Sequence, residues 1–229
     1  MSRNETLNSL LVYGLPTIIL LGSIIWLGKK NIIDLVSIEN KKVKIKDVLI
    51  SICITLLIFL NPFLSQFSIM SEEARNSFIG TLVPGDFYVF LTMVIVAPVF
   101  EELLFRGVIF RGLKENYPSF WAFTISALFF GLLHTNIITS IILALFWSWL
   151  YYNTKNISVC IISHATCNLI GFVLRVYIQK GNDINIFYPI EEHLYLISIG
   201  LTFMAGLLFF IMFKRLKYHQ MEEKIIDAI

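Results

Sequence analysis

Charged side chains are scarce in this chain of 229 residues. Only 15% of the residues are charged and 57% are hydrophobic, whereas a soluble domain averages about 25% charged and about 45–50% apolar residues. The mean hydropathy is +0.76. This composition argues against a soluble domain and predicts an integral, multi-pass membrane protein with nearly all of its length in or near the lipid bilayer.

Cysteine is rare as well, and its three positions, Cys53, Cys160 and Cys167, all lie in apolar runs. An odd number at no metal-like spacing argues against a disulfide framework, so we expect three buried small side chains. The sequence also lacks internal repeats, low-complexity segments and linkers, and nothing in it indicates nucleic-acid binding. We therefore treat residues 1–229 as a single membrane domain.

Long apolar runs predict an all-α, polytopic transmembrane helical bundle, because about 20 such residues cross a bilayer. We expect about seven spans, within a range of six to eight. They cover approximately residues 8–27, 47–66, 86–105, 119–135, 137–153, 157–178 and 193–213. Lysines follow the first run, which predicts a retained helix rather than a cleaved signal peptide. The fourth and fifth runs are short and nearly contiguous, so one of them is a candidate re-entrant segment.

Lysine and arginine positions predict the orientation. Six lysines lie between residues 29 and 46, after the first span, and indicate a cytoplasmic loop. Basic residues recur after the third, fifth and seventh spans, whereas the loops after the second and sixth contain acidic residues. Seven spans with this alternation predict an N-out, C-in topology. Frequent Ile, Asn and Lys suggest a bacterial source, hence a bacterial cell membrane.

Two adjacent carboxylates, Glu101 and Glu102, follow an uncharged run from Phe87 to Phe100. Ionisable residues inside a span cost about 2.5–3.5 kcal/mol on insertion scales and are functional sites by default. Glu102 and Arg106 are four residues apart, so on a helix they share a face and can pair. Glu101 then points about 100° away. The alternative is a buried ion pair that only fixes helix packing.

Two further polar groups lie at helical spacing in apolar runs. Phe130 and His134 are four residues apart, as are His164 and Asn168. Taken alone, His134 is an interfacial or hydrogen-bonded histidine, and His164 with Asn168 is an interhelical hydrogen-bond pair. Their coincidence with an intramembrane diacid favours a site that activates water for peptide-bond hydrolysis.

Each residue type suits one part of that chemistry. A glutamate can take the proton from water, and histidine can orient the water or bind a metal that acidifies it. Asparagine and histidine N–H groups can stabilise an oxyanion. The chain has no HExxH motif, so the site is not of the zincin type.

Glu101-Glu102-x-x-x-Arg106, Phe130-x-x-x-His134 and His164-x-x-x-Asn168 occur in this order on successive predicted helices. In these motifs, within residues 98–170, the chain resembles the CAAX protease and bacteriocin-processing family, also called the Abi or CPBP intramembrane proteases. The resemblance implies a helical-bundle endopeptidase whose catalytic core covers about residues 86–178.

The resemblance also implies roles for individual residues. Glu101 is the expected base that activates water, and His134 assists it. His164 and Asn168 are the expected oxyanion hole, with Glu102 and Arg106 in support. The family is described both as metalloproteases and as metal-independent glutamate proteases. No cofactor is certain: Glu101, His134 and His164 could ligate zinc or another divalent metal, or act without one.

The expected substrate is a membrane-associated peptide or protein, in bacterial peptide or bacteriocin maturation or in immunity. The alternative is a non-catalytic bacteriocin-immunity or peptide-binding membrane protein with the same fold. A proton- or ion-coupled transporter is a third reading, because intramembrane Glu and His also form proton relays. It predicts repeated halves with matching broken helices, which this sequence lacks.

One feature of the span map conflicts with a shared site. On the predicted topology, Glu101 lies about 15 residues, roughly 22 Å, from the outer face. His164 lies at a compatible depth, about 10 Å from the inner face, but His134 ends a span that starts inside. Convergence of the three residues therefore requires a fourth span that starts deeper, tilts strongly or is broken.

Overall fold

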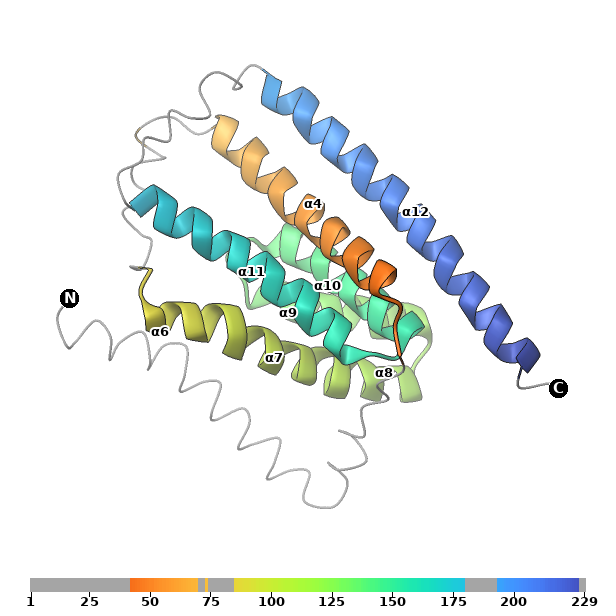
Figure 1. Cartoon of the computed structure of the whole chain (residues 1–229). Coiled ribbons are helices and arrows are strands. Elements are labelled where there is room, and N and C mark those ends of the chain that lie inside the picture. The colour runs from red at the N-terminus through yellow and green to blue at the C-terminus, as the bar shows by residue number, and fades with distance from the viewer. Residues whose placement is uncertain (1–41, 70–72, 74–84, 180–192, 227–229) are drawn as a thin grey trace, which may run out of the picture.

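The computed structural model describes residues 42–69, 73, 85–179 and 193–226, and the regular secondary structure in these ranges is entirely helical (Figure 1). Four helices there are long and apolar enough to cross a membrane: Phe87–Asn116, Ile137–Thr154, Ile157–Ile178 and Leu196–His219. The chain is thus an all-α, helical membrane bundle, as predicted. The expected first span, 8–27, lies outside the described residues.

From α6 to α11 the helices follow one another with short connections, whereas longer segments separate α4 from α6 and α11 from α12. In order they are α4 (Ile45–Ile69), α6 (Phe87–Phe90), η2 (Leu91–Val96), α7 (Ala97–Glu102), η3 (Leu103–Phe110), α8 (Arg111–Asn116), α9 (Ser119–Leu132), α10 (Ile137–Thr154), α11 (Ile157–Gln179) and α12 (Leu194–Ile226). The segments from α6 to α8 form one continuous helix of 30 residues.

That continuous helix contains two π-helical segments, η2 and η3, which flank α7 and its two carboxylates. In η2 the N–H of Ala97 bonds to the carbonyl of Thr92, five residues back. The next residue, Pro98, has no N–H to continue this pattern, so it leaves the carbonyl of Met93 without a backbone donor. Segments of π-helix are frequent at functional sites.

The helix at the fourth expected span, α9, ends three residues before the expected end at residue 135. α9 has 14 residues, about 21 Å at 1.5 Å per residue, whereas the hydrocarbon core is about 30 Å thick. The helix ends at Leu132, and His134 lies in the turn before α10, not at the end of a span over 119–135. The Phe87–Asn116 helix also runs past residue 105, the end of the expected third span. Glu101 therefore lies 15 residues before the end of that helix (101 to 116), and His134 lies 15 residues after the start of α9 (119 to 134), so the conflict in depth disappears.

Helices α10 and α11 match the expected fifth and sixth spans, and specific residues determine where these helices begin and end. The side chain of Asn136 accepts a hydrogen bond from the N–H of Thr139 and caps α10. Asn156 caps α11 through the N–H of Val159 at 3.1 Å. Between these helices, Lys155 adopts a left-handed conformation (φ 52°, ψ 33°) and ends α10. The caps fix a tight α10–α11 connection.

Helix α12 extends beyond the expected span 193–213. It has 33 residues, reaches Ile226 and packs against α4 at the edge of the bundle (Figure 1). Near its C-terminal end Arg215 donates to the buried Asp47 of α4 at 2.7 Å. His219 of the same helix lies 3.3 Å from Lys44. Residues 214–226, beyond the expected span, therefore continue the helix that packs on α4.

The buried core lies where α4, α10, α11 and η3 meet, and it includes Ile54, Phe105, Trp147, Leu150 and Cys160. All three cysteines are free thiols, and Cys160 and Cys167 are buried as expected. The expectation was wrong for Cys53, which is exposed on α4. In a bundle surrounded by lipid, an apolar run does not require burial inside the protein.

Candidate active site

Glu102 and Arg106 form a fully buried ion pair at the boundary of α7 and η3. The Nη1 of Arg106 lies 3.0 Å from the Oε1 of Glu102, and both side chains have 0% exposure. The Nη2 of Arg106 donates to the carbonyl of Ala144 in α10 at 3.2 Å. The pairing expected from the four-residue spacing is confirmed, and it also joins this helix to α10.

His164 of α11 joins the same pair. Its Nδ1 lies 2.9 Å from Glu102 Oε1, the oxygen that also binds Arg106. An ionised carboxylate only accepts hydrogen bonds, so His164 must carry its proton on Nδ1. Glu102 therefore fixes the orientation of the imidazole and directs its Nε2 elsewhere.

That Nε2 faces Glu101. The Oε2 of Glu101 lies 3.8 Å from the Nε2 of His164 and 3.6 Å from the Nε2 of His134. His134 and His164, the expected assistant and oxyanion donor, therefore both lie near one carboxylate oxygen of Glu101, the expected base. Glu101 and His134 are 27% and 31% exposed, whereas the side chain of His164 is 4% exposed. Of these three side chains, Glu101 and His134 are the partly exposed ones, so another molecule can approach the cluster on their side.

The proton positions on the two histidines follow from their other partners. The Nδ1 of His134 lies 2.7 Å from the carbonyl of Phe130, which can only accept, so this nitrogen is the donor. In their neutral forms, both imidazoles thus present an unprotonated Nε2 to Glu101. Within the described residues Glu101 Oε2 has no hydrogen-bond partner. The cluster is suited to hold a proton or a water molecule between one oxygen and two nitrogens.

Asn168 lies one turn after His164 on α11, but its amide serves a backbone group. Its Nδ2 donates to the carbonyl of Met93 at 2.8 Å, the carbonyl that Pro98 leaves without a donor in η2. One of the two N–H groups of the Asn168 amide is therefore occupied in holding α11 to the π-helical turn.

Trp147 and Thr55, which no sequence motif singled out, also hold the cluster. Trp147 of α10 stacks on the imidazole of His164 with ring centroids 4.3 Å apart. Its indole N–H donates to Thr55 of α4 at 3.1 Å. Phe130 stacks in the same way on His134, at 4.3 Å. An apolar run contains many such aromatic residues, and only the packing distinguishes these from lipid-facing ones.

A metal site requires ligand atoms of a suitable type in a suitable arrangement. Two unprotonated imidazole nitrogens and a carboxylate oxygen are zinc ligands in chemical type. However, no group of three His, Cys, Asp or Glu side chains in the described part of the chain is arranged to hold a metal ion. Glu101, His134 and His164 thus have donor types that suit zinc but are not placed as a ready-made three-ligand site.

Comparison with known proteins points to one family. Residues 83–170 match the family described as "Type II CAAX prenyl endopeptidase Rce1-like". The chain is 29% identical over 115 residues to the UPF0177 protein YbdI of Lactococcus lactis subsp. lactis, covering 48% of this chain and 61% of that protein. It is 27% identical over 113 residues to "Putative membrane peptidase YdiL" of Bacillus subtilis, covering 48% and 46%.

A third relative, from Mycoplasma capricolum subsp. capricolum, is 35% identical over 96 residues, covering 39% of this chain and 27% of the relative. The chain thus spans about half of the length of YbdI and YdiL. No solved structure matches it. Four long apolar helices and the similarity to the bacterial "Putative membrane peptidase YdiL" identify an integral protein of a bacterial cell membrane. The matched segment contains all seven motif residues, and in this segment the chain is similar to the Rce1-like CAAX prenyl endopeptidases.

Proposed function

We propose that the chain is an intramembrane endopeptidase that hydrolyses a peptide bond with water activated by Glu101. The observation that carries the proposal is the position of Glu101 Oε2, 3.6 Å and 3.8 Å from two imidazole nitrogens. The Nδ1 atoms of both histidines are held by other groups, so both rings are oriented before substrate arrives. Such preorganisation is what general-base catalysis requires of its components.

In this mechanism a water molecule binds between Glu101 and His134. Glu101 takes a proton from the water as the oxygen attacks the scissile carbonyl carbon, and His134 orients the water through its Nε2. The proton then passes to the amide nitrogen as the carbon–nitrogen bond breaks. The carboxylic acid and the amine that form are then released, and Glu101 returns to its ionised starting form.

His164 and Asn168 are the proposed donors to the oxyanion. His164 donates its Nδ1 proton to Glu102, so its Nε2 can donate to an oxyanion only when the ring carries a second proton. Glu102 holds the ring in this orientation, and Arg106 holds Glu102 in place. Asn168 contributes through the amide N–H that is not bound to Met93.

The proposed substrate is a membrane-associated peptide or protein, because Glu101 lies in the middle of an apolar helix. Glu101 and His134 are the partly exposed residues of the cluster, so the substrate would approach from their side. Maturation of a bacterial peptide or bacteriocin, or immunity to one, fits this substrate class and the bacterial relatives. A non-catalytic immunity or peptide-binding protein is the alternative. It requires no proton acceptor, so it leaves the position of Glu101 unexplained.

The test is cleavage of a panel of membrane-anchored peptides by the purified protein, compared with Glu101→Gln. Loss of a general base typically costs about 10²- to 10⁴-fold in rate. Glu73→Gln serves as the matched control, because it neutralises an exposed glutamate. Unchanged cleavage by Glu101→Gln would reject the mechanism, and unchanged immunity or binding in cells would favour the non-catalytic alternative.

The same assay with a chelator tests the role of metal. Chelator-insensitive cleavage by the wild type, lost in Glu101→Gln, is the expected result for glutamate-activated water. Cleavage that the chelator abolishes and zinc restores would instead show that the three residues rearrange around a metal ion.

A further inference from the structure

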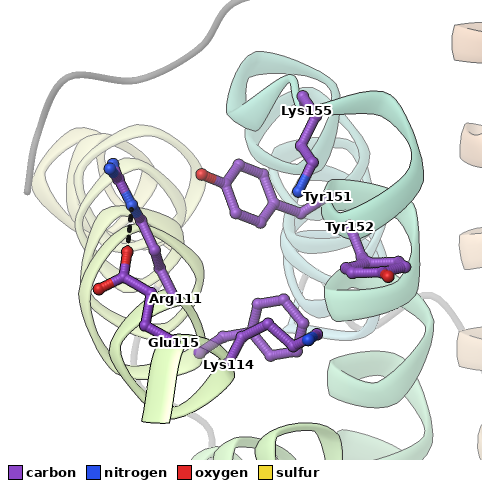
Figure 2. Close-up of a pocket in the computed structure, with 7 residues that line it drawn as sticks. Arg111, Lys114, Glu115, Tyr151, Tyr152 and Lys155 are labelled. Atoms are coloured by element: carbon purple, nitrogen blue, oxygen red, sulfur yellow. Dashed lines mark hydrogen bonds and ion pairs between the residues drawn. The ribbon is translucent and has the colours of Figure 1, made fainter. Parts of the chain in front are cut away.

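A second cluster of functional side chains lies away from the catalytic residues, between α8 and the C-terminal end of α10. It lines a cavity of about 180 Å³. The lining residues are Phe110, Arg111, Lys114, Glu115, Tyr151, Tyr152 and Lys155, and Figure 2 shows their polar groups facing a common space. The proposed peptidase mechanism uses none of them.

The cavity has an excess of positive charge. Its four ionisable residues are three cations and one carboxylate, Glu115. Glu115 pairs with Arg111 at 3.3 Å in a partly exposed contact (Figure 2). The Nζ atoms of Lys114 and Lys155 lie 5.8 Å and 5.0 Å from the ring centroid of Tyr152. Lys114 of α8 and Lys155 at the end of α10 therefore approach the same aromatic ring. The carboxylate of the cavity, Glu115, pairs with Arg111.

The backbone holds one of these lysines in place. Lys155 is the only non-glycine residue with positive φ in the described ranges, and its N–H bonds to the carbonyl of Tyr151 at 2.8 Å. This left-handed residue ends α10 and starts the turn to α11. The position of Lys155 is thus set by the helix end rather than by a flexible loop.

The floor of the cavity is apolar and its rim is polar. Phe110 and Tyr151 are buried, at 2% and 7% exposure, while Tyr152 is 37% exposed. The cavity lies where the apolar part of the Phe87–Asn116 helix gives way to charged residues. Tyrosines and basic residues at such a boundary are typical of the membrane interface. Basic pockets between helices on the cytoplasmic side suit anionic lipid head groups.

We propose that this cavity binds the phosphate group of an anionic phospholipid at the basic end of the bundle. Lys114 and Lys155 would contact the phosphate, and Arg111 would contact it or a second acidic oxygen. The lipid's acyl chains would continue over the exposed apolar side chains next to the cavity. The proposal does not depend on the peptidase activity, and a binding experiment can test it alone.

Native mass spectrometry of the full chain in neutral detergent measures the binding. Phosphatidylglycerol and phosphatidylcholine are added separately at equal concentration. We expect the wild type to retain phosphatidylglycerol, and the Lys114→Gln/Lys155→Gln variant to bind it roughly tenfold to thirtyfold more weakly. Lys214→Gln is the matched control, because Lys214 lies over the ring of Phe210 on α12, outside the cavity.

Three further arms make the result decisive. Thermal unfolding without lipid checks that the double variant is folded, and the two single variants replace it if it is not. Lys114→Arg/Lys155→Arg keeps both charges and should keep lipid binding. Equal phosphatidylglycerol binding by the wild type and the glutamine variants would overturn the proposal. Displacement of the lipid by equimolar inorganic phosphate or by an acidic peptide would overturn it as well.

Discussion

The Nδ1 of His164 lies 2.9 Å from Glu102 Oε1, the same oxygen that Arg106 contacts at 3.0 Å. Glu102 is therefore the link between a buried cation and an imidazole of the candidate site. Glu101, the residue before it, instead faces the Nε2 atoms of His134 and His164. Adjacent carboxylates on one helix thus have different surroundings, which is the usual basis for different roles.

Glu102→Gln should strongly destabilise the protein. It leaves the guanidinium of Arg106 buried without a counter-charge, and breaking one side of such a pair costs about 3–5 kcal/mol. Thermal or denaturant unfolding in detergent measures the loss. The double variant Glu102→Gln/Arg106→Met removes both charges and should be more stable than the single variant. If Glu102→Gln unfolds like the wild type, the pair is not what holds η3 to α10.

Asn168→Ala should reduce stability, because it leaves the Met93 carbonyl in η2 without its donor. An unsatisfied buried group costs about 1–3 kcal/mol. Adding Pro98→Ala supplies a backbone N–H to this turn and should restore most of the stability. Measuring peptide cleavage by the double variant distinguishes the role of Asn168 in stability from its proposed role in the oxyanion hole. Restored cleavage along with restored stability would contradict its proposed contribution to the oxyanion hole.

Gly131→Ala should disturb the junction that positions His134. A methyl group at Gly131 would meet Ile141 Cγ1 at 2.4 Å and the carbonyl of Ile137 at 3.0 Å. Forcing an extra carbon into packed structure costs about 1–3 kcal/mol, so we expect a lower unfolding temperature and weaker cleavage. Gly206→Ala is the control, since nothing lies within 4 Å of that position. Equal effects of the two substitutions would show that α9 and α10 do not pack closely there.

Thr55→Val should loosen the aromatic support of His164. The substitution keeps the shape of the side chain but removes the acceptor of the Trp147 indole, at a cost of about 1 kcal/mol. Trp147 is a positioning residue, so the chemical step should slow more than substrate binding weakens. Steady-state kinetics provide this comparison, with Thr55→Ser as the conservative control. A change in KM alone would assign Thr55 and Trp147 to substrate binding.

The sequence was informative where contacts are local. The spacing of Glu102 and Arg106 predicted their pair because residues four apart on a helix are neighbours. The motif Phe130-x-x-x-His134 misled the span map, since a helical spacing does not reveal that the helix ends at Leu132. The break became visible only as a conflict in depth between His134 and Glu101.

Apart from the meeting of the motif residues, contacts between distant segments could not be predicted from the sequence. Thr55 and Trp147 are ordinary residues of apolar runs, and their hydrogen bond depends on how α4 packs against α10. The bond from Asn168 to Met93 depends on a missing N–H at Pro98 and on the approach of α11. His219 contacts Lys44 only because α12 continues past its expected end. Each requires the tertiary arrangement.

The two π-helical segments allow the ends of the Phe87–Asn116 helix to differ in rotation about the helix axis while its centre stays the same. A π segment can arise from one extra residue within an α-helix, and each such residue shifts the following side chains by about 100°. Because η2 and η3 lie on either side of Glu101 and Glu102, insertions or deletions there can rotate the lipid-facing ends while the carboxylates keep their aim. Relatives can therefore differ in helix length and membrane fit without changing the arrangement of the candidate site.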